Sequence, residues 1–233
     1  MRKEQILTKI EKFKRCGQRF LPEPVCEEIL ALYDIPTPPA QLARESGEAV
    51  ELARQIGFPV VLKVISPQII HKSDAGGVMV NLKSEEEVER AFRKILENAK
   101  SYNPKAEIEG IYVQKMAPPG REVIIGAVKD AQFGPVVMFG LGGIFVEVLK
   151  DVVFRVAPID EEEAREMVDE IRGLPILKGV RGEKPIDFDS LSQAISNVSR
   201  LVVDFPQIEQ FDANPVCVYP DRLYAVDARI ILE

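Results

Sequence analysis

Apolar residues recur at helical spacing in the first quarter of the chain. Residues 23–33 and 43–56 place apolar side chains three and four positions apart, and the second segment stops before Gly57. The N-terminal stretch interleaves charges with apolar positions in a similar way, which indicates an amphipathic helix and not a secretory signal. Three helices are therefore expected before the first strong strand pattern.

Short apolar runs bounded by Gly, Pro, Asn and Asp predict strands along the rest of the chain. The expected strands are residues 58–65, 78–82, 108–116, 121–130 and 134–143, followed by a hairpin over residues 208–228 that turns at 219–222. Helices are expected at residues 84–99, 160–171 and 187–203, the first of them with Ser84 as N-cap and Glu87 three positions later. This order predicts an α/β (α+β) fold with antiparallel strand pairs. Since no linker interrupts residues 1–233, it favours two lobes of one unit over two independent domains.

Composition narrows the class of protein. The chain has 233 residues, of which 46% are apolar and 29% charged, and this is ordinary globular composition. No segment approaches the run of about 20 apolar residues that spans a membrane. A formal charge of −7 argues against a general nucleic-acid surface, and three cysteines without metal-ligand spacing support neither a disulfide framework nor a zinc site. We expect a cytoplasmic protein that binds neither nucleic acid nor membrane.

Lys63 interrupts the apolar strand predicted at residues 58–65. A buried amine is costly unless it pairs with an acid or with a ligand such as a phosphate group, so Lys63 is a candidate phosphate contact. The alternative is a lysine on the solvated face of an edge strand. Gly76 and Gly77 follow between two predicted strands, where glycine allows backbone N–H groups to approach phosphate closely. Such a pair also occurs in plain hairpins, and its spacing fits neither the Walker A pattern nor the dinucleotide-binding fingerprint.

His71 is the only histidine in the sequence, and it stands in a polar segment between two predicted strands. One imidazole cannot build a multi-histidine metal site, and a lone histidine is more often structural than catalytic. Neutral imidazole is nevertheless a nucleophile near pH 7, and a histidine that takes up phosphate divides one difficult transfer into two easier ones. His71 is therefore a candidate phosphate carrier, with a structural role as the alternative.

Three oxygen-bearing side chains cluster in the predicted C-terminal hairpin. Asp212 and Asn214 are two positions apart on one strand, so their side chains should point the same way, and Asp227 is expected on the partner strand. Carboxylate and amide oxygens suit Mg²⁺, which prefers a few carboxylates together with nucleotide phosphates. Turn chemistry at Asn214 and a surface position for Asp227 are the alternative.

Between these two groups, the strand that ends near residue 116 could present Gln114 and Met116 to an adenine edge. Glu122 could hold ribose hydroxyls, and Arg155 could neutralise phosphate. Each of them could equally be an ordinary strand or surface residue.

Seven motifs in a fixed order resemble one family. They are LKV at Lys63, HKSDAGGV at residues 71–78, GREVIIG at 120–126, FGPVVMFGLGGIFVE at 133–147, FRVAPI at 154–159, ILKGVRG at 176–182, and FDANPV at 211–216 followed by VDAR at 226–229. Over nearly its whole length the chain resembles the beta subunits of ADP-forming acetyl-CoA synthetases, which are ATP-grasp proteins related to the beta subunit of succinyl-CoA synthetase.

The resemblance implies two α/β lobes that close over a nucleotide, a small lobe of about residues 25–115 and a larger metal-binding lobe of about residues 116–233 against which the N-terminal helix packs. It implies ATP or ADP and Mg²⁺ as cofactors, His71 as the group that relays phosphate to ADP, and Asp212 as the acid that supports this step. Asn214 and Asp227 correspond to the metal ligands. The implied nucleotide contacts are Lys63, Gln114, Met116 and Glu122, to which the residue chemistry above adds Gly76, Gly77 and Arg155.

The family also implies a partner. Its reaction converts acyl-CoA, ADP and phosphate to carboxylic acid, ATP and CoA, and a separate alpha subunit binds CoA, so we expect a hetero-tetramer or similar assembly. Related sequences often carry glutamate where this chain has Gln210, so the resemblance leaves the role of that position open. Two rival functions are an ATP-grasp carboxylate ligase that works through a free acyl phosphate, and a non-catalytic adenine-nucleotide sensor.

Overall fold

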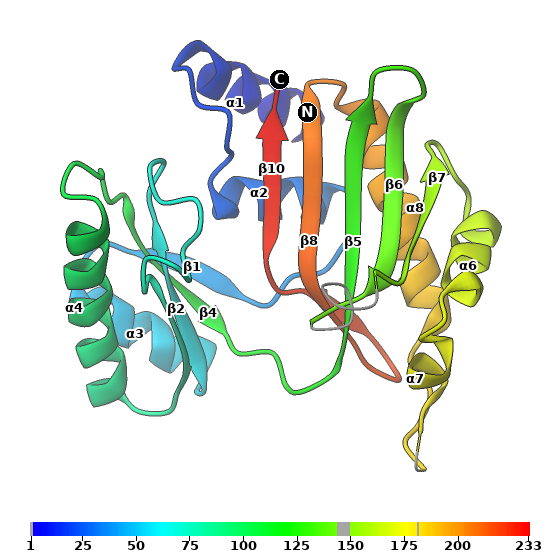
Figure 1. Ribbon diagram of the computed structural model, residues 1–233. Helices are drawn as coiled ribbons and strands as arrows, with labels where there is room; N and C mark the ends of the chain where they lie inside the picture. Colours follow the sequence, from blue (N-terminus) through cyan, green and yellow to red (C-terminus); the bar gives the residue numbers. More distant parts are fainter. Residues whose placement is uncertain (1, 144–149, 181) are drawn as a thin grey trace. The chain divides into compact units, whose positions relative to one another are not determined.

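The computed structural model describes residues 2–143, 150–180 and 182–233 (Figure 1). Two compact units share the chain: unit 1 comprises Met1–Leu21, Val25–Thr37 and Pro119–Glu233, and unit 2 comprises Pro22–Pro24 and Pro38–Pro118. Each unit has its own hydrophobic core. The division lies close to the boundary expected at residues 115–116, but residues 25–37 group with the C-terminal part. Residues 144–147 and 181, which belong to two of the family-like motifs, fall outside the described residues.

Unit 2 is a four-stranded antiparallel sheet with two helices packed against it. Its elements are β1 (Ala40–Ala43), α3 (Ser46–Ile56), β2 (Val60–Ile65), β3 (Val78–Leu82), α4 (Glu85–Tyr102) and β4 (Gly110–Lys115), and the strand order is β1-β4-β2-β3. The apolar stripes of α3 and α4 bury Leu52, Phe92 and Ile95 against the sheet. As predicted, Ser84 caps α4 by accepting a hydrogen bond of 3.3 Å from the backbone N–H of Glu87.

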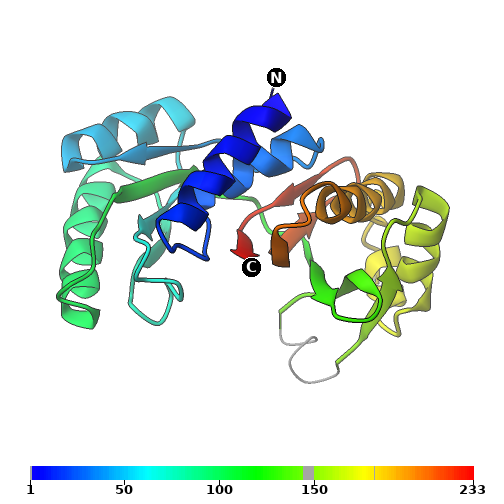
Figure 2. The same ribbon diagram turned by 90° about the horizontal axis from the view of Figure 1, so that it is seen from above.

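Unit 1 is built on a larger antiparallel sheet. Its elements are α1 (Arg2–Arg15), α2 (Glu23–Leu32), β5 (Arg121–Asp130), β6 (Gly134–Leu141), β7 (Val152–Val156), α6 (Glu161–Glu170), α7 (Leu174–Lys178), α8 (Phe188–Asp204), β8 (Ile208–Val218), β9 (Leu223–Ala225) and β10 (Ala228–Leu232). The first two residues of α2 belong to unit 2. The strand order is β10-β8-β5-β6-β7, and β9 pairs with β8. Figures 1 and 2 show α1, α2 and α8 on the same side of this sheet.

Alternation along the strands separates the two faces of the six-stranded sheet. Val123, Ile125 and Ala127 of β5 enter the core with the helices, so the intervening positions face the other way. Between Ala213 and Val216 strand β8 has one residue more than the facing part of β5, which is a β-bulge. Because of this extra residue, Ala213 and Val216 are both buried in the core although they are three positions apart.

Side-chain caps mark the starts of α6 and α8 in unit 1. Asp160 and Glu163 form a capping box at α6. At α8, Asp187 accepts hydrogen bonds from Ser190, one of 3.0 Å from its backbone N–H and one of 2.5 Å from its hydroxyl. These caps satisfy backbone donors that have no partner inside the helix.

Several expectations need correction. Residues 43–45, predicted to begin a helix, lie at the end of β1 and before α3, while β1, β7 and the short helix α7 were not expected. Lys63 is not on an edge strand, because β2 lies between β4 and β3. Within the described part of the chain, no helix is long and apolar enough to cross a membrane.

Candidate active site

Lys63 is buried on a central strand of unit 2. The residue is 5% exposed, and its Nζ lies 2.6 Å from Oε1 of Glu23, whose exposure is 4%. The solvent-exposed alternative for Lys63 is therefore wrong. An ammonium group removed from water in this way requires a charged or strongly polar partner, which Glu23 supplies.

His71 lies at the start of a compact turn between β2 and β3, and its side chain is exposed. Its carbonyl accepts a hydrogen bond of 3.3 Å from Ala75, and the next carbonyl, that of Lys72, accepts one of 2.7 Å from Gly77. The Lys72 side chain reaches Glu23, with 2.5 Å between Nζ and Oε2. An imidazole in contact with solvent beside a firmly held backbone is open to a phosphoryl donor.

The two glycines after His71 are required by close packing. Gly76 has a φ of +58°, and Asn98 of α4 donates a hydrogen bond of 2.9 Å to its carbonyl. A Cβ on Gly77 would lie 2.4 Å from Cγ1 of Val64. Both glycines therefore shape the turn that presents His71, and this packing explains their presence independently of any phosphate contact.

The expected adenine-binding segment is held firmly within unit 2. Gln114 of β4 is fully buried, and the backbone N–H of Met116 donates a hydrogen bond of 3.1 Å to Pro59. The neighbouring Lys115 donates its backbone N–H to Pro39 over 2.8 Å and its Nζ to the carbonyls of residues 57 and 58, each over 2.8 Å. The N–H groups of residues 115 and 116 are thus already used, so any main-chain contact to a base from these two residues would use their carbonyl oxygens.

Unit 1 brings the three candidate oxygen ligands close together where β8 pairs with β10. Asp212 and Asn214 flank the buried Ala213, and the N–H of Asn214 donates a hydrogen bond of 3.1 Å to the carbonyl of Asp227. Asp227 lies between β9 and β10 and not on a partner strand as expected. Burial raises the pKa of Asp212; Arg229, with Nη2 at 3.5 Å, lowers it, and the charge of Asp227 raises it further.

This donor set fits a hard divalent cation. Among the described residues, no three His, Cys, Asp or Glu side chains converge, so the candidate metal site consists of two acids and the amide of Asn214. The repulsion between Asp212 and Asp227 would be relieved by a cation bound between them. Few protein ligands are what Mg²⁺ uses when phosphate oxygens and water complete its coordination.

Glu122 and Arg155 lie on different faces of the sheet. Glu122 is exposed at the start of β5, opposite Cys217, and the pKa of that thiol is raised by burial and then by the charge of Glu122. Arg155 pairs in register with the core residue Val137 and forms an ion pair with Glu170 of α6. Asp212, by contrast, occupies the row of Gly126 and Met138 on the other face. We therefore leave Arg155 out of the candidate site.

The sequence alone does not reveal the roles of Glu23, Lys72, Arg229 or Asn98. Their contacts join residues distant in sequence, as the pair of Glu23 with Lys63 shows. A glutamate between two prolines at the start of a predicted helix carries no local sign of such a partner. The pairing of Asp212 with Arg229 joins residues closer in sequence, because both lie in or next to the predicted C-terminal hairpin.

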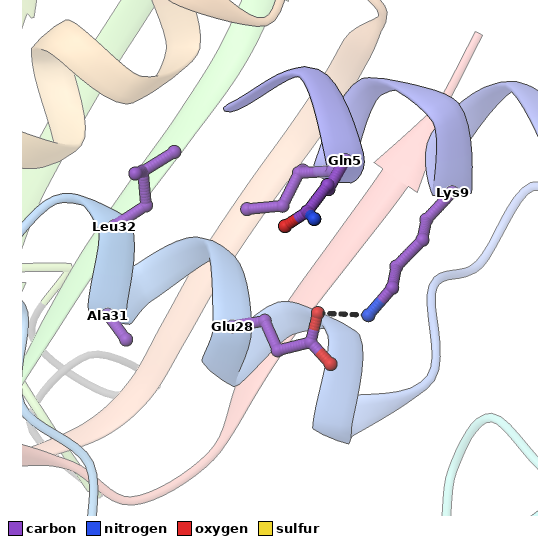
Figure 3. A pocket seen from close by; sticks show the side chains of 6 residues that line it. Gln5, Lys9, Glu28, Ala31 and Leu32 are labelled. Carbon is purple, nitrogen blue, oxygen red and sulfur yellow. Dashed lines mark hydrogen bonds and ion pairs between the residues drawn. The ribbon is translucent and has the colours of Figure 1, made fainter. Parts of the chain in front are cut away.

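A separate pocket of about 570 Å³ in unit 1 is lined by residues of α1 and α2 (Figure 3). Lys9 and Glu28, two of the lining residues, form an ion pair. It contains none of the candidate catalytic, nucleotide or metal residues, so we do not assign it to the active site.

Comparison with known proteins identifies the family to which the chain belongs. A family model described as an ATP-grasp domain matches residues 12–232. The beta subunit of acetate–CoA ligase (ADP-forming) I from Pyrococcus furiosus is 54% identical over 223 residues, which are 96% of this chain and 96% of that protein. The chain belongs to this beta-subunit family. The expected family and ATP-grasp fold are thereby confirmed.

Solved structures of the family have the same fold. One, from Ca. Korarchaeum cryptofilum, is an acetyl-coenzyme A synthetase in complex with coenzyme A, Ca-AMPCP and HgCl⁺; it has a TM-score of 0.94 and 50% identity, covering 97% of this chain and 99% of that one. Another structure from the same organism contains coenzyme A and Mg-AMPPCP, with its phosphohistidine segment pointing towards the nucleotide binding site. Its TM-score is 0.85 at 46% identity, over 96% of this chain and 98% of that one.

Proposed function

We propose that this chain is the nucleotide-binding beta subunit of an ADP-forming acyl-CoA synthetase and that His71 carries phosphate to ADP. Membership of the beta-subunit family supports the overall reaction. The proposed partner is a CoA-binding alpha subunit that forms the acyl phosphate and delivers its phosphate on a histidine of its own. Nucleotide and phosphoryl chemistry then take place on this chain.

The covalent step moves one phosphoryl group twice. A nitrogen of His71 attacks the phosphorus of the incoming phosphohistidine; a new N–P bond forms as the old one breaks, and the partner's imidazole leaves. A terminal oxygen of ADP then attacks the same phosphorus, the bond to His71 breaks, and ATP forms. Each imidazole regains its electron pair on leaving, so no outside oxidant or base is needed.

The other candidate residues bind and orient the reactants. Lys63 is proposed to contact nucleotide phosphates, and Gln114, Met116 and Glu122 to position the nucleoside. Asn214 and Asp227 would hold Mg²⁺, which neutralises phosphate charge when it is bound. Asp212 is proposed as the acid that supports the phosphohistidine step.

One observation carries the histidine relay: the only histidine of the sequence is exposed at the start of a turn whose backbone is hydrogen-bonded at Lys72 and Gly76. We expect γ-labelled ATP to transfer its label to wild-type protein in a form that is labile to acid and stable to base. His71→Asn should take up no label and should form no ATP with the partner subunit, while ADP binding measured by calorimetry changes by less than about threefold.

Ser73→Ala is the matched control, because Ser73 is an exposed hydroxyl on the same turn and a phosphate ester would return its phosphate too slowly. It should keep the label. A folded His71→Asn protein with undiminished ATP formation would exclude the relay and favour the carboxylate-ligase alternative, in which a free acyl phosphate reacts directly.

A further inference from the structure

One buried carboxylate connects Lys63 with the turn that carries His71. Glu23 is 4% exposed, and each of its two oxygens accepts a hydrogen bond from one lysine. Oε1 lies 2.6 Å from Nζ of Lys63, and Oε2 lies 2.5 Å from Nζ of Lys72. The side chains of these two lysines are 6% and 18% exposed. Three chain segments thus meet within unit 2: the start of α2, strand β2 and the turn after it.

The burial of the Glu23 carboxylate depends on its contacts with both lysines. A carboxylate in this position has lost nearly all contact with water, which costs free energy unless charged donors satisfy both oxygens. Glu23 also stands in the first turn of α2, where the helix dipole favours a negative charge. Both oxygens of Glu23 are therefore held by lysine donors at the start of α2.

We propose that Glu23 is a positioning residue for phosphate transfer: it fixes the ammonium group of Lys63 for the nucleotide and, through Lys72, the peptide bond next to His71. This rests on the proposed function of Lys63 and His71. Lysine is a flexible four-carbon chain with a point charge at its end, so an unheld Lys63 would lose entropy on each binding event. A charge already held in place stabilises phosphate without that loss.

The Lys72 contact acts on the backbone of its own residue. Lys72 follows His71 directly, and its carbonyl accepts the hydrogen bond from Gly77 that closes the turn. With the side chain held by Glu23 and the carbonyl by Gly77, the turn is fixed on the side nearest His71. Release of Lys72 should therefore slow phosphorylation of His71 more than it weakens nucleotide binding.

The test uses Glu23→Gln in the full chain, with ADP affinity from calorimetry and the rate of His71 labelling from γ-labelled ATP. We expect ADP affinity to fall by about tenfold or more and labelling to slow at least as much, because a charged hydrogen bond to each lysine is lost. Lys72→Met should slow labelling by about tenfold while ADP affinity changes by less than about threefold.

A double-mutant cycle separates positioning from general loss of structure. If Glu23 acts on the nucleotide through Lys63, then Lys63→Met and the double variant Glu23→Gln/Lys63→Met bind ADP within about twofold of each other. Glu28→Gln is the control, since Glu28 lies on the same helix in an exposed ion pair with Lys9 (Figure 3), and it should leave affinity and labelling unchanged. If circular dichroism shows that Glu23→Gln does not fold, Glu23→Asp provides the cycle with the charge retained and the reach shortened.

The possible failures are distinct. Wild-type labelling and ADP affinity in folded Glu23→Gln, or losses that multiply in the double variant, would overturn the positioning role. A wild-type chain that takes no label, with Glu23→Gln still weakening ADP binding through Lys63, would refute the histidine relay and support the link between Glu23 and Lys63.

Discussion

At the scale of single residues, two carboxylates that are removed from water, Glu23 and Asp212, have different charged neighbours. In unit 2 the Glu23 carboxylate meets the ammonium groups of two lysines. In unit 1 the half-buried Asp212 lies near both Arg229 and Asp227, and burial raises its pKa. In the first arrangement two ammonium groups balance the acid, whereas in the second a bound cation would relieve the repulsion between Asp212 and Asp227. This contrast supports the metal assignment to unit 1.

We expect Asn214→Ala and Asp227→Ala each to weaken Mg-ADP binding by about tenfold, because each substitution removes an oxygen ligand from the proposed metal. Calorimetry with and without Mg²⁺ isolates the effect, since affinity for metal-free ADP should change little. Gln210→Ala, an exposed amide on the same strand, is the control and should bind like wild type. Full Mg²⁺ dependence in both variants would remove these two residues from the metal site.

At the scale of elements, the stability of helix α8 depends on the cap that Asp187 forms at its start. Asp187→Ala should lower the free energy of unfolding by about 1 kcal/mol, because the backbone N–H of Ser190 loses its acceptor. Hydrogen bonds from the hydroxyl and then from the backbone of Ser190 lower the pKa of Asp187. A carboxyl with a lowered folded pKa stabilises the fold above its unfolded value of about 3.9, and this contribution is lost as pH falls through the folded pKa.

Urea titrations from pH 7 downward measure this dependence. The difference between wild type and Asp187→Ala should be constant at neutral pH and should shrink below about pH 4. Asp187→Asn keeps a capping oxygen, so it should resemble wild type at pH 7 and show less change on acidification. A difference that grows on acidification would contradict this account of the cap.

Elements with a local signature were predictable from the sequence. Helix α4 has a strong amphipathic pattern and a capping residue at Ser84, and the turn of the β8–β9 hairpin closes with a hydrogen bond of 2.8 Å from Tyr219 to Arg222. Strand β1, with four residues, is too short to show a period, and β7 was obscured by polar Arg155 within an apolar run. Periodicity also cannot reveal that Asp227 lies in the connection between β9 and β10.

The sequence predicts those residues of the candidate site that are unusual by themselves, but not those whose role comes from distant contacts. His71, Lys63 and Asp212 stand out as unusual in their local sequence. Glu23 does not, because its role comes from a contact across 40 positions of the chain with Lys63. Arg155 was a candidate by charge alone, and only the strand register shows that it belongs to the row of Val137.

At the scale of the whole molecule, the proposed reaction draws on both compact units. Lys63 and His71 belong to unit 2, while Asp212, Asn214 and Asp227 belong to unit 1. Each group is held by its own core, with Phe92 and Ile95 in one and Phe139 and Phe205 in the other. Damage to one core should therefore impair one set of contacts first.

We expect the chain alone to form no ATP from acyl-CoA, ADP and phosphate, and the addition of a CoA-binding subunit to restore the reaction. The reason is that phosphate must reach His71 on a carrier, inside a site that excludes water from the phosphohistidine. Luciferase detection of ATP measures the outcome, and the partner subunit alone is the control. Full ATP synthesis by the isolated chain would contradict the proposal that a CoA-binding subunit is required.

The extra residue in β8 affects how this protein can change over evolutionary time. Substitutions at Asn214 or Pro215 leave the strand at its present length. A deletion of either residue would place Ala213 and Val216 two positions apart, the spacing of Ile125 and Val123 on β5, so both would stay in the core and only the bulge would be lost. Descendants of this sequence can therefore alter the candidate metal site one side chain at a time, and the loss of one residue there would straighten β8 without turning its core residues outward.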